Sequence, residues 1–185
     1  SSSWNERAKL NNSTSISSVN TQAQPSTTIK PDPAMKIKDN FIFFEDSRFP
    51  SLNNKVEYSK AVGDLARIQD KMLKDRGQAS NFPQILIGNG KYTGKCDSGK
   101  ESLGVYTFGN GCNTILINFA SDGIAYEYPI EVLTTLAHEY AHHLANVTIG
   151  IDSSSGLENE LLADCFAGLL HGYWDKYGKV SRQEV

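Results

Sequence analysis

The sequence predicts an α+β domain in which a small antiparallel sheet packs against two long helices. Two stretches, 129–147 and 157–177, repeat apolar residues at helical spacing and are joined by the segment GIDSSSG. Three shorter apolar runs, 82–88, 103–108 and 112–119, have the length and the flanking glycines of strands. The chain of 185 residues is long enough for one domain with a sizeable core.

The first 34 residues differ in composition from the rest of the chain. Residues 1–34 are rich in Ser, Thr, Asn and Pro and carry only isolated apolar residues. Such a segment buries too little apolar surface to offset the entropy of ordering, so we interpret it as a disordered tail or tether. The folded domain is expected to span 35–185.

Two further elements complete the predicted fold. Apolar residues at helical spacing predict a helix over 56–75, and the Arg76-Gly77 pair ends it. The turn GNG joins 103–108 to 112–119 as a hairpin, because glycine and asparagine tolerate positive φ. We expect the strand at 103–108 to lie at the edge of the sheet.

Charge and hydropathy exclude several classes of function. The formal net charge is −3 and no run of Lys and Arg stands out, so nucleic-acid binding is not indicated. No apolar stretch is long enough to cross a bilayer, and no signal-peptide pattern opens the chain. The expected partner is a peptide or protein substrate, for the reasons given below.

The three cysteines suggest one disulfide and one free thiol. Cys96 and Cys112 lie in a Gly-rich region of loops and strands, whereas Cys165 lies in an apolar helical pattern. We interpret the first two as a disulfide and Cys165 as a buried, inert thiol. A disulfide favours an extracellular or cell-envelope location. Three reduced thiols in a cytosolic protein remain the alternative.

The stretch LAHEYAHHL, residues 136–144, carries the residues that point to chemistry. His138 and His142 are four apart, so on a helix their imidazoles project from one face and suit two corners of a tetrahedral zinc site. Glu139 lies beside them and can take a proton from an activated water. This is the H-E-x-x-H pattern of zinc peptidases. A helix whose histidines are satisfied by hydrogen bonds alone is the competing interpretation.

A third ligand is expected from the second long helix. Thr148 stands where a metzincin would have its third histidine, which excludes that class. Glu160 and Asp164 share one helical face, and the longer Glu160 is the better ligand. Asp164 can then accept the second ring N–H of a ligating histidine. Asp152, in the connecting loop, is another candidate.

The remaining histidines compete with this assignment. His171 lies about 16 Å along the helix axis from Glu160, so both cannot bind one zinc ion. His143 points away from the face of His138 and His142, and we expect it to pack or to cap rather than to ligate. Glu158 is expected on the solvated surface.

Three protein ligands leave the fourth zinc position to water, as in catalytic rather than structural sites. Glu139 is therefore predicted to be a general base in peptide hydrolysis. An inactive zinc-binding or interaction module is the alternative function, and a redox role for Cys165 is a third. Tyr106, Tyr173 and His171 are candidates for stabilising the oxyanion, and the sequence does not choose among them.

The segments HEYAHHL and ELLADCFAGLLHGYW resemble the bacterial neutral zinc metallopeptidase family, within the wider gluzincin group. The resemblance covers roughly residues 82–175 and implies a zincin-like fold. It places the family's zinc ligands on His138, His142 and Glu160, and its catalytic glutamate on Glu139.

The resemblance also places an aspartate of the family on Asp164 and its paired cysteines on Cys96 and Cys112. Asn113 and Asn118 depart from the residues that the family usually has around the second strand of the hairpin. The family also continues past the second helix, so a transition-state donor from that later region would not be found in this sequence.

Overall fold

The structure is a computed structural model that describes residues 37, 39–90, 92, 94–96, 102–119, 129–150 and 156–177, with the side chains of the last helix described as far as residue 174. The predicted tail at 1–34 lies outside these residues, as does Asp152. The described elements follow the order β1, α2, β2, β3, β4, α3 and α4 along the chain.

Four strands form one mixed sheet: β1 (Phe41–Glu45), β2 (Gln84–Asn89), β3 (Gly104–Gly109) and β4 (Cys112–Asn118). Their spatial order is β1-β2-β4-β3. The β1–β2 and β2–β4 pairs are parallel, and only β3 runs antiparallel to its neighbour β4. The prediction of an antiparallel sheet is therefore wrong for all but the hairpin.

β1 and β2 are parallel because α2, the helix at Lys55–Asp75, connects them along the chain. A crossover of this length returns the chain to the same end of the sheet, so the next strand pairs in parallel. The segment FIFFE was not predicted to be a strand. Without β1, the helix α2 could not be recognised as a crossover between two parallel strands. The hairpin of β3 and β4 is confirmed, and β3 lies at the edge as predicted.

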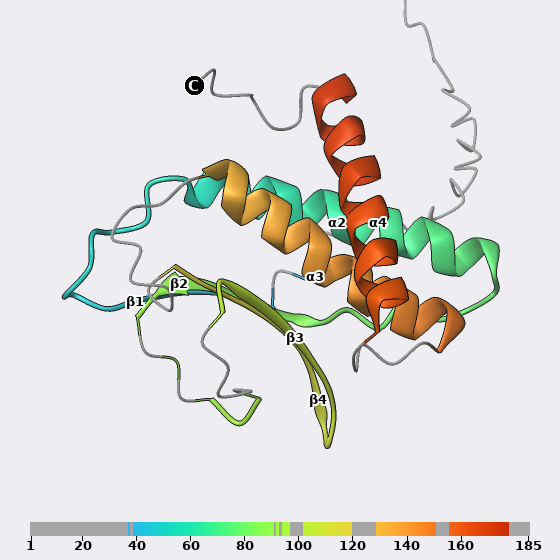
Figure 1. The fold of residues 1–185 in the computed structure, drawn as a ribbon, viewed down its shortest axis with the longest axis horizontal. Coiled ribbons are helices and arrows are strands. Elements are labelled where there is room, and N and C mark those ends of the chain that lie inside the picture. The colour runs from blue at the N-terminus through green and yellow to red at the C-terminus, as the bar shows by residue number, and fades with distance from the viewer. Residues whose placement is uncertain are drawn as a thin grey trace, which may run out of the picture. The chain divides into compact units, whose positions relative to one another are not determined.

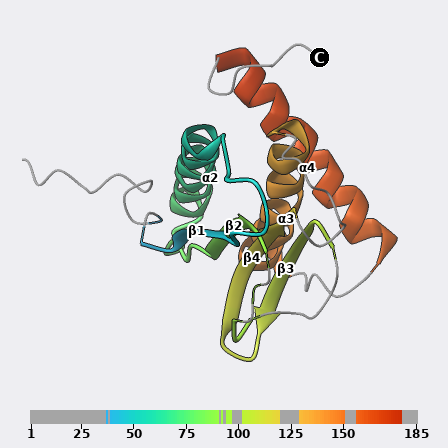
Figure 2. The ribbon, with the colours of Figure 1, turned by 90° about the vertical axis from the view of Figure 1, so that its left-hand side faces the viewer.

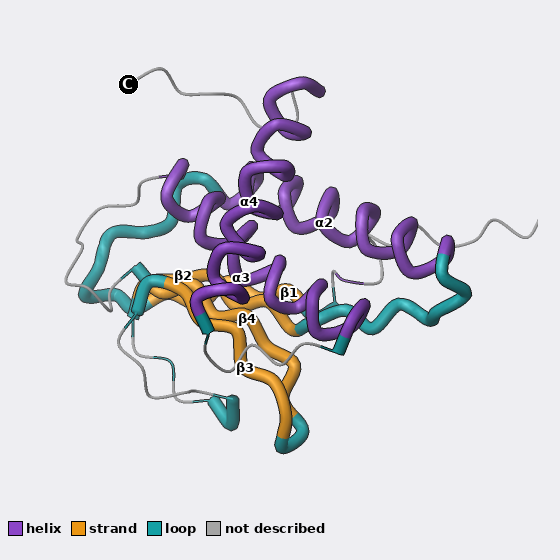
Figure 3. The backbone as a smooth tube through the Cα atoms, turned by 45° about the vertical axis from the view of Figure 1, so that its right-hand side comes forward, coloured by secondary structure: helices purple, strands orange, loops and turns teal. Residues whose placement is uncertain are grey.

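All three described helices lie on the same side of the sheet (Figures 1 and 3). They are α2, α3 (Pro129–Ile149) and α4 (Leu157–Tyr177), and each matches a predicted helix. Residues from the sheet and from all three helices form one hydrophobic core, which includes Ile85, Ile115, Leu65, Leu136 and Trp174. The domain is thus α+β, with a helical layer on one face of a small sheet.

Only one face of α4 is buried. Ala163, Ala167, Leu170 and Trp174 are buried, whereas the leucines of the opposite face are exposed. Cys165 lies on that exposed face, so the prediction of a buried thiol is wrong. The apolar residues of α4 are distributed over nearly its whole circumference. Such a sequence pattern does not reveal which face of the helix packs against a neighbour.

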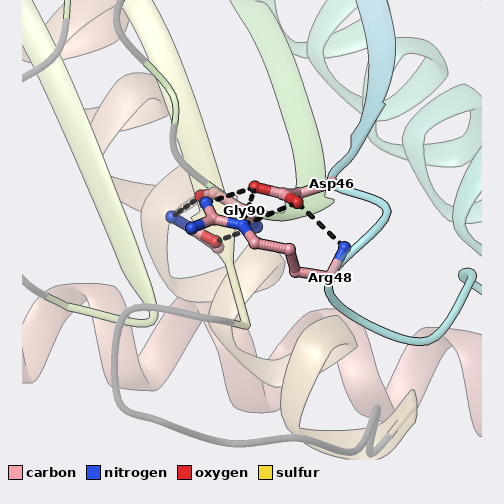
Figure 4. Close-up of polar contacts among 4 residues, drawn as sticks. Asp46, Arg48 and Gly90 are labelled. Atoms are coloured by element: carbon pink, nitrogen blue, oxygen red, sulfur yellow. Dashed lines mark hydrogen bonds and ion pairs between the residues drawn. The ribbon is translucent and has the colours of Figure 1, made fainter.

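The carboxyl ends of the three parallel strands β1, β2 and β4 lie at the same end of the sheet, where short polar loops follow them (Figure 4). Asp46, just after β1, accepts hydrogen bonds from the backbone and the guanidinium of Arg48. Arg48 holds the pKa of the Asp46 carboxyl at about 2 through these bonds. The Asn118 side chain bonds both the N–H and the C=O of Gly90. These contacts fix the loops without forming a cluster of candidate ligands.

Cys96 and Cys112 form a disulfide with a Cα–Cα distance of 5.7 Å, as predicted. It ties the segment before β3 to the first residue of β4. Among the described residues, no helix is long and apolar enough to cross a membrane.

Removal of this disulfide should destabilise the domain. The bond spans 16 residues of sequence, so the double variant Cys96→Ser/Cys112→Ser is expected to lose about 3 kcal/mol of unfolding free energy, through the larger entropy of the open unfolded chain. Urea denaturation without reductant measures the loss. Cys165→Ser is the matched control, because Cys165 is exposed and unbonded. Equal stability of the double variant and the control contradicts the prediction.

Candidate metal centre

Helices α3 and α4 pack against each other (Figure 2) and bring three predicted ligand residues together. His138 Nε2 lies 3.1 Å from His142 Nε2 and 3.1 Å from Glu160 Oε2. His142 Nε2 and Glu160 Oε2 are 3.6 Å apart. Among the described residues, these three form a cluster that could hold a metal ion.

The spacing of these atoms fits a tetrahedral zinc ion. Zinc–nitrogen bonds of about 2.0–2.1 Å place two ligand atoms about 3.3–3.4 Å apart at tetrahedral angles. The three observed separations, 3.1, 3.1 and 3.6 Å, lie on both sides of this value. Two imidazoles and one carboxylate are also the ligand types that zinc takes in catalytic sites.

Asp164 lies against the ring of the first of these histidines. Its Oδ1 lies 2.9 Å from His138 Nδ1, so the neutral imidazole carries its proton on Nδ1 and donates it to the carboxylate. This tautomer leaves a lone pair on His138 Nε2, which points at His142 and Glu160. His138 Nε2 and Glu160 Oε2 are then both acceptors, and a proton on His142 Nε2 can bridge to only one of them. A cation satisfies all three.

The surroundings of His142 favour its neutral imidazole. His142 is buried, and burial is the main cause that lowers its pKa, followed by the neighbouring His138. Glu160 raises the pKa of His142, but its own side chain is 52% exposed. A metal ligand must be an unprotonated imidazole, so this environment prepares His142 for coordination. Glu160 adds the third candidate ligand atom from the solvent side of the cluster.

Glu139 is buried on the side of α3 that faces the edge strand. The Cα of Gly104, the first residue of β3, comes so near that a β-carbon there would lie 3.1 Å from Glu139 Oε1 and 2.2 Å from Thr135 Cγ2. Only glycine fits this approach. The carboxylate is therefore held between the helix and the start of β3, one residue from the candidate ligand His138.

His143 packs in the core and hydrogen-bonds there, as predicted. Its Nε2 lies 3.1 Å from Gln69 Oε1, and its Nδ1 lies 3.3 Å from the Tyr106 hydroxyl. The Gln69 amide is oriented by two bonds, since Nε2 donates to the Asn81 carbonyl and Oε1 accepts from the Tyr140 hydroxyl. His143 therefore donates from Nε2 to Gln69 Oε1, and its Nδ1 lies between the Tyr106 hydroxyl and Asn113 Oδ1, which is 3.0 Å away.

The three candidate oxyanion donors lie in different surroundings. The Tyr106 hydroxyl is buried with His143 and lies 3.1 Å from Asn113 Oδ1. The ring of His171 packs edge-to-face on Trp174, 5.3 Å between centroids, and burial lowers its pKa. Tyr173 is partly exposed on the same helix.

Sequence reasoning missed three residues that shape this region. Gly104 read as an ordinary strand residue, although a glycine inside a strand pattern is a known signal of close backbone approach. Gln69 and Asn113 contact the buried His143, and neither carries a motif of its own. Their partners are distant in the sequence, so spacing could not reveal them.

Comparisons with models of known protein families, with curated proteins and with solved structures found no match to this chain. The family resemblance drawn from the two helical motifs therefore stays a prediction.

The buried His143 should make stability depend on pH. Burial holds its pKa at about 4, below its ordinary value of 6.5, so between these values the unfolded chain binds a proton that the folded chain does not. This contribution is intact above pH 6.5, and it falls by about 3 kcal/mol as the pH drops to 4. Urea denaturation of chelator-treated protein at several pH values measures it. The difference between wild type and His143→Gln should shrink toward acid, and a constant difference contradicts the assignment.

Proposed function

We propose that this chain is a zinc-dependent peptidase. The observation that carries the proposal is the convergence of His138 Nε2, His142 Nε2 and Glu160 Oε2 at 3.1–3.6 Å from two helices. Asp164 on the His138 ring and Glu139 beside it complete the set of groups that metal-assisted hydrolysis needs. The resemblance of both helical motifs to bacterial neutral zinc metallopeptidases, and through them to a zincin-like fold, supports the same assignment.

Each residue of the centre has a separate task. His138, His142 and Glu160 would hold the ion, and Asp164 fixes the tautomer of His138. A zinc ion bound there would supply Lewis-acid chemistry for hydrolysis. Glu139 is placed to act as the general base that takes a proton from the attacking water, and then as the acid that returns it to the leaving amine. Burial against β3 holds this carboxylate in one place.

The edge strand is the expected docking surface for an extended peptide. β3 lies at the edge of the sheet beside α3, and its first residue contacts Glu139. Alternate backbone groups of an edge strand point away from the sheet and can pair with a peptide in the manner of an added strand. A substrate bound there would pass next to the proposed general base.

An inactive zinc-binding or interaction module is the alternative function. It would use the same three ligands but has no need of a buried carboxylate beside them. Glu139 therefore favours the enzyme. The Cys96–Cys112 disulfide supports an extracellular or cell-envelope location, where such bonds persist.

Metal content tests the ligand set. Wild-type protein should bind about one equivalent of zinc, and His142→Ala should lose it, because two remaining ligands do not hold the ion. Asp164→Asn is expected to weaken zinc binding about 10–100-fold while leaving the three ligands in place. Competition with a chromophoric chelator and mass spectrometry measure both. Glu158→Gln, on the exposed first turn of α4, is the control and should bind zinc as wild type does. Zinc retained by His142→Ala contradicts the site.

The role of Glu139 is tested by hydrolysis. Glu139→Gln should keep its zinc and its fold, and should lower the rate of cleavage of fluorescently labelled casein by at least about 10²-fold, since the general base is lost. Glu131→Gln, on the exposed start of α3, is the control and should cleave as wild type does. Zinc-loaded wild type without activity on casein or on peptide libraries would favour the inactive module.

A further inference from the structure

Thr135 and Glu139 lie one turn apart on α3, and both face the first residue of β3. A β-carbon built on Gly104 would lie 2.2 Å from Thr135 Cγ2 and 3.1 Å from both Cγ and Oε1 of Glu139. The methyl group of Thr135 is therefore the nearest neighbour of this backbone position, and the Glu139 side chain is the next. Thr135 lies three residues before His138, outside the H-E-x-x-H pattern, so the motif does not point to it.

The strand β3 and this face of α3 stay in step over two contacts. Along α3, Thr135, Glu139 and His143 are spaced by four residues, or about 6 Å per step. Gly104 and Tyr106 are two residues apart on β3, or about 6.6 Å. Gly104 lies against Thr135 and Glu139, and the Tyr106 hydroxyl lies 3.3 Å from His143 Nδ1. Glu139 is thus placed between a steric contact and a hydrogen-bonded contact of the same strand.

The start of β3 is held by hydrogen bonds on both sides of the Leu103–Gly104 peptide bond. The Leu103 carbonyl accepts a bond of 2.8 Å from the backbone N–H of Asn118 on β4. The Gly104 carbonyl accepts a bond of 2.7 Å from the Ser102 hydroxyl. The Asn118 side chain is in turn bonded to the backbone of Gly90. These bonds oppose movement of the strand away from the helix.

Of the two side chains that face Gly104, Glu139 is the one that can adjust. Thr135 carries its methyl group directly on the β-carbon, and a β-branched side chain on a helix has few allowed rotamers. The Glu139 carboxylate lies at the end of several rotatable bonds. A change in the gap between β3 and α3 therefore moves the carboxylate more easily than it moves Thr135.

We propose that Thr135 is a positioning residue for Glu139. Its methyl group sets how closely the start of β3 approaches α3, and the width of this gap sets where the Glu139 carboxylate is held. The inference rests on the proposed function in one respect, because the task of Glu139 as general base belongs to the proposed peptidase. The contact itself depends neither on a metal ion nor on activity.

The two distances at Gly104 separate the contribution of each neighbour. Ordinary van der Waals contact begins at 3.4 Å, so a β-carbon at this position requires a displacement of about 1.2 Å from Thr135 Cγ2 but only about 0.3 Å from Glu139 Oε1. Removal of the Thr135 methyl group eliminates the larger displacement. Gly104→Ala is therefore expected to disturb the carboxylate, and an added Thr135→Ser is expected to relieve most of the disturbance.

Carbon-13 NMR of the Glu139 carboxyl group tests the contact on zinc-free protein. Side-chain-labelled glutamate supplies the signals, and the one absent from Glu139→Gln is assigned to Glu139. Thr135→Ser should shift this signal because the gap loses a methyl group, whereas Thr135→Val keeps a methyl group there and should leave the signal in place. Thr134→Ser, the same change on the exposed side of α3, is the control. A signal that neither Thr135 variant moves, or that both move equally, overturns the proposal.

Rescue of hydrolysis tests the consequence for the general base. Zinc-loaded Gly104→Ala should cleave labelled casein about 10²-fold more slowly than wild type, as expected for a catalytic group displaced by about 1 Å. Gly104→Ala/Thr135→Ser should regain at least about tenfold, and Gly104→Ala/Thr134→Ser should not. Rates are compared among variants with wild-type zinc content and circular dichroism. Equal rates of the two double variants overturn the positioning role.

Failure of the proposed function is distinguishable from failure of this inference. Zinc-loaded wild type that cleaves neither casein nor peptide libraries contradicts the peptidase. The carboxyl signals of Thr135→Ser and Thr135→Val still decide whether the Thr135 methyl group positions Glu139, since they require neither zinc nor substrate. They also require no substitution of Gly104, so they decide the contact even if Gly104→Ala does not fold.

Discussion

The close packing of α3 on α4 is the constraint on which the candidate centre depends. Its ligand atoms come from two helices and lie within 3.1–3.6 Å of one another. Glu160 and Asp164 reach His138 because Ala163 and Ala167, on the same side of α4, are small and buried. Larger side chains there would move the helix axes apart, since interaxial distance follows the size of the residues at the contact. The carboxylates would then fall short of the histidines.

The opposite side of α3 is fixed by the sheet. Gly104 lets the start of β3 touch Glu139, and the Tyr106–His143 contact holds the same strand further along. One contact depends on the absence of a side chain and the other on a buried hydrogen-bond network with Gln69. A buried polar network of this kind tolerates only one arrangement, because each unsatisfied member is costly. The edge strand is thereby held in register against the helix that carries His138, His142 and the proposed base.

Local patterns predicted the helices and the hairpin from spacing within one segment, and they pointed to the two disulfide cysteines and to the three residues of the candidate cluster. His138 and His142 lie one turn apart on one face of α3, and Glu160 and Asp164 lie one turn apart on one face of α4. The parallel pairing of β1 was missed because it depends on where a crossover returns the chain. The exposure of Cys165 was missed because an apolar helix does not show which stripe meets a neighbour. Gln69 and Gly104 act through partners that are distant in the sequence.

Metal binding and helix packing are physically coupled in this arrangement. Once His138 donates its Nδ1 proton to Asp164, His138 Nε2 and the Glu160 carboxylate are both acceptors, and one proton on His142 Nε2 can bridge only one of them. Glu160, which is half exposed, can turn toward solvent when no cation is bound. The buried His142 has no such freedom. A bound cation turns the same atoms into a bridge between the helices, so that ligand binding and helix docking stabilise each other.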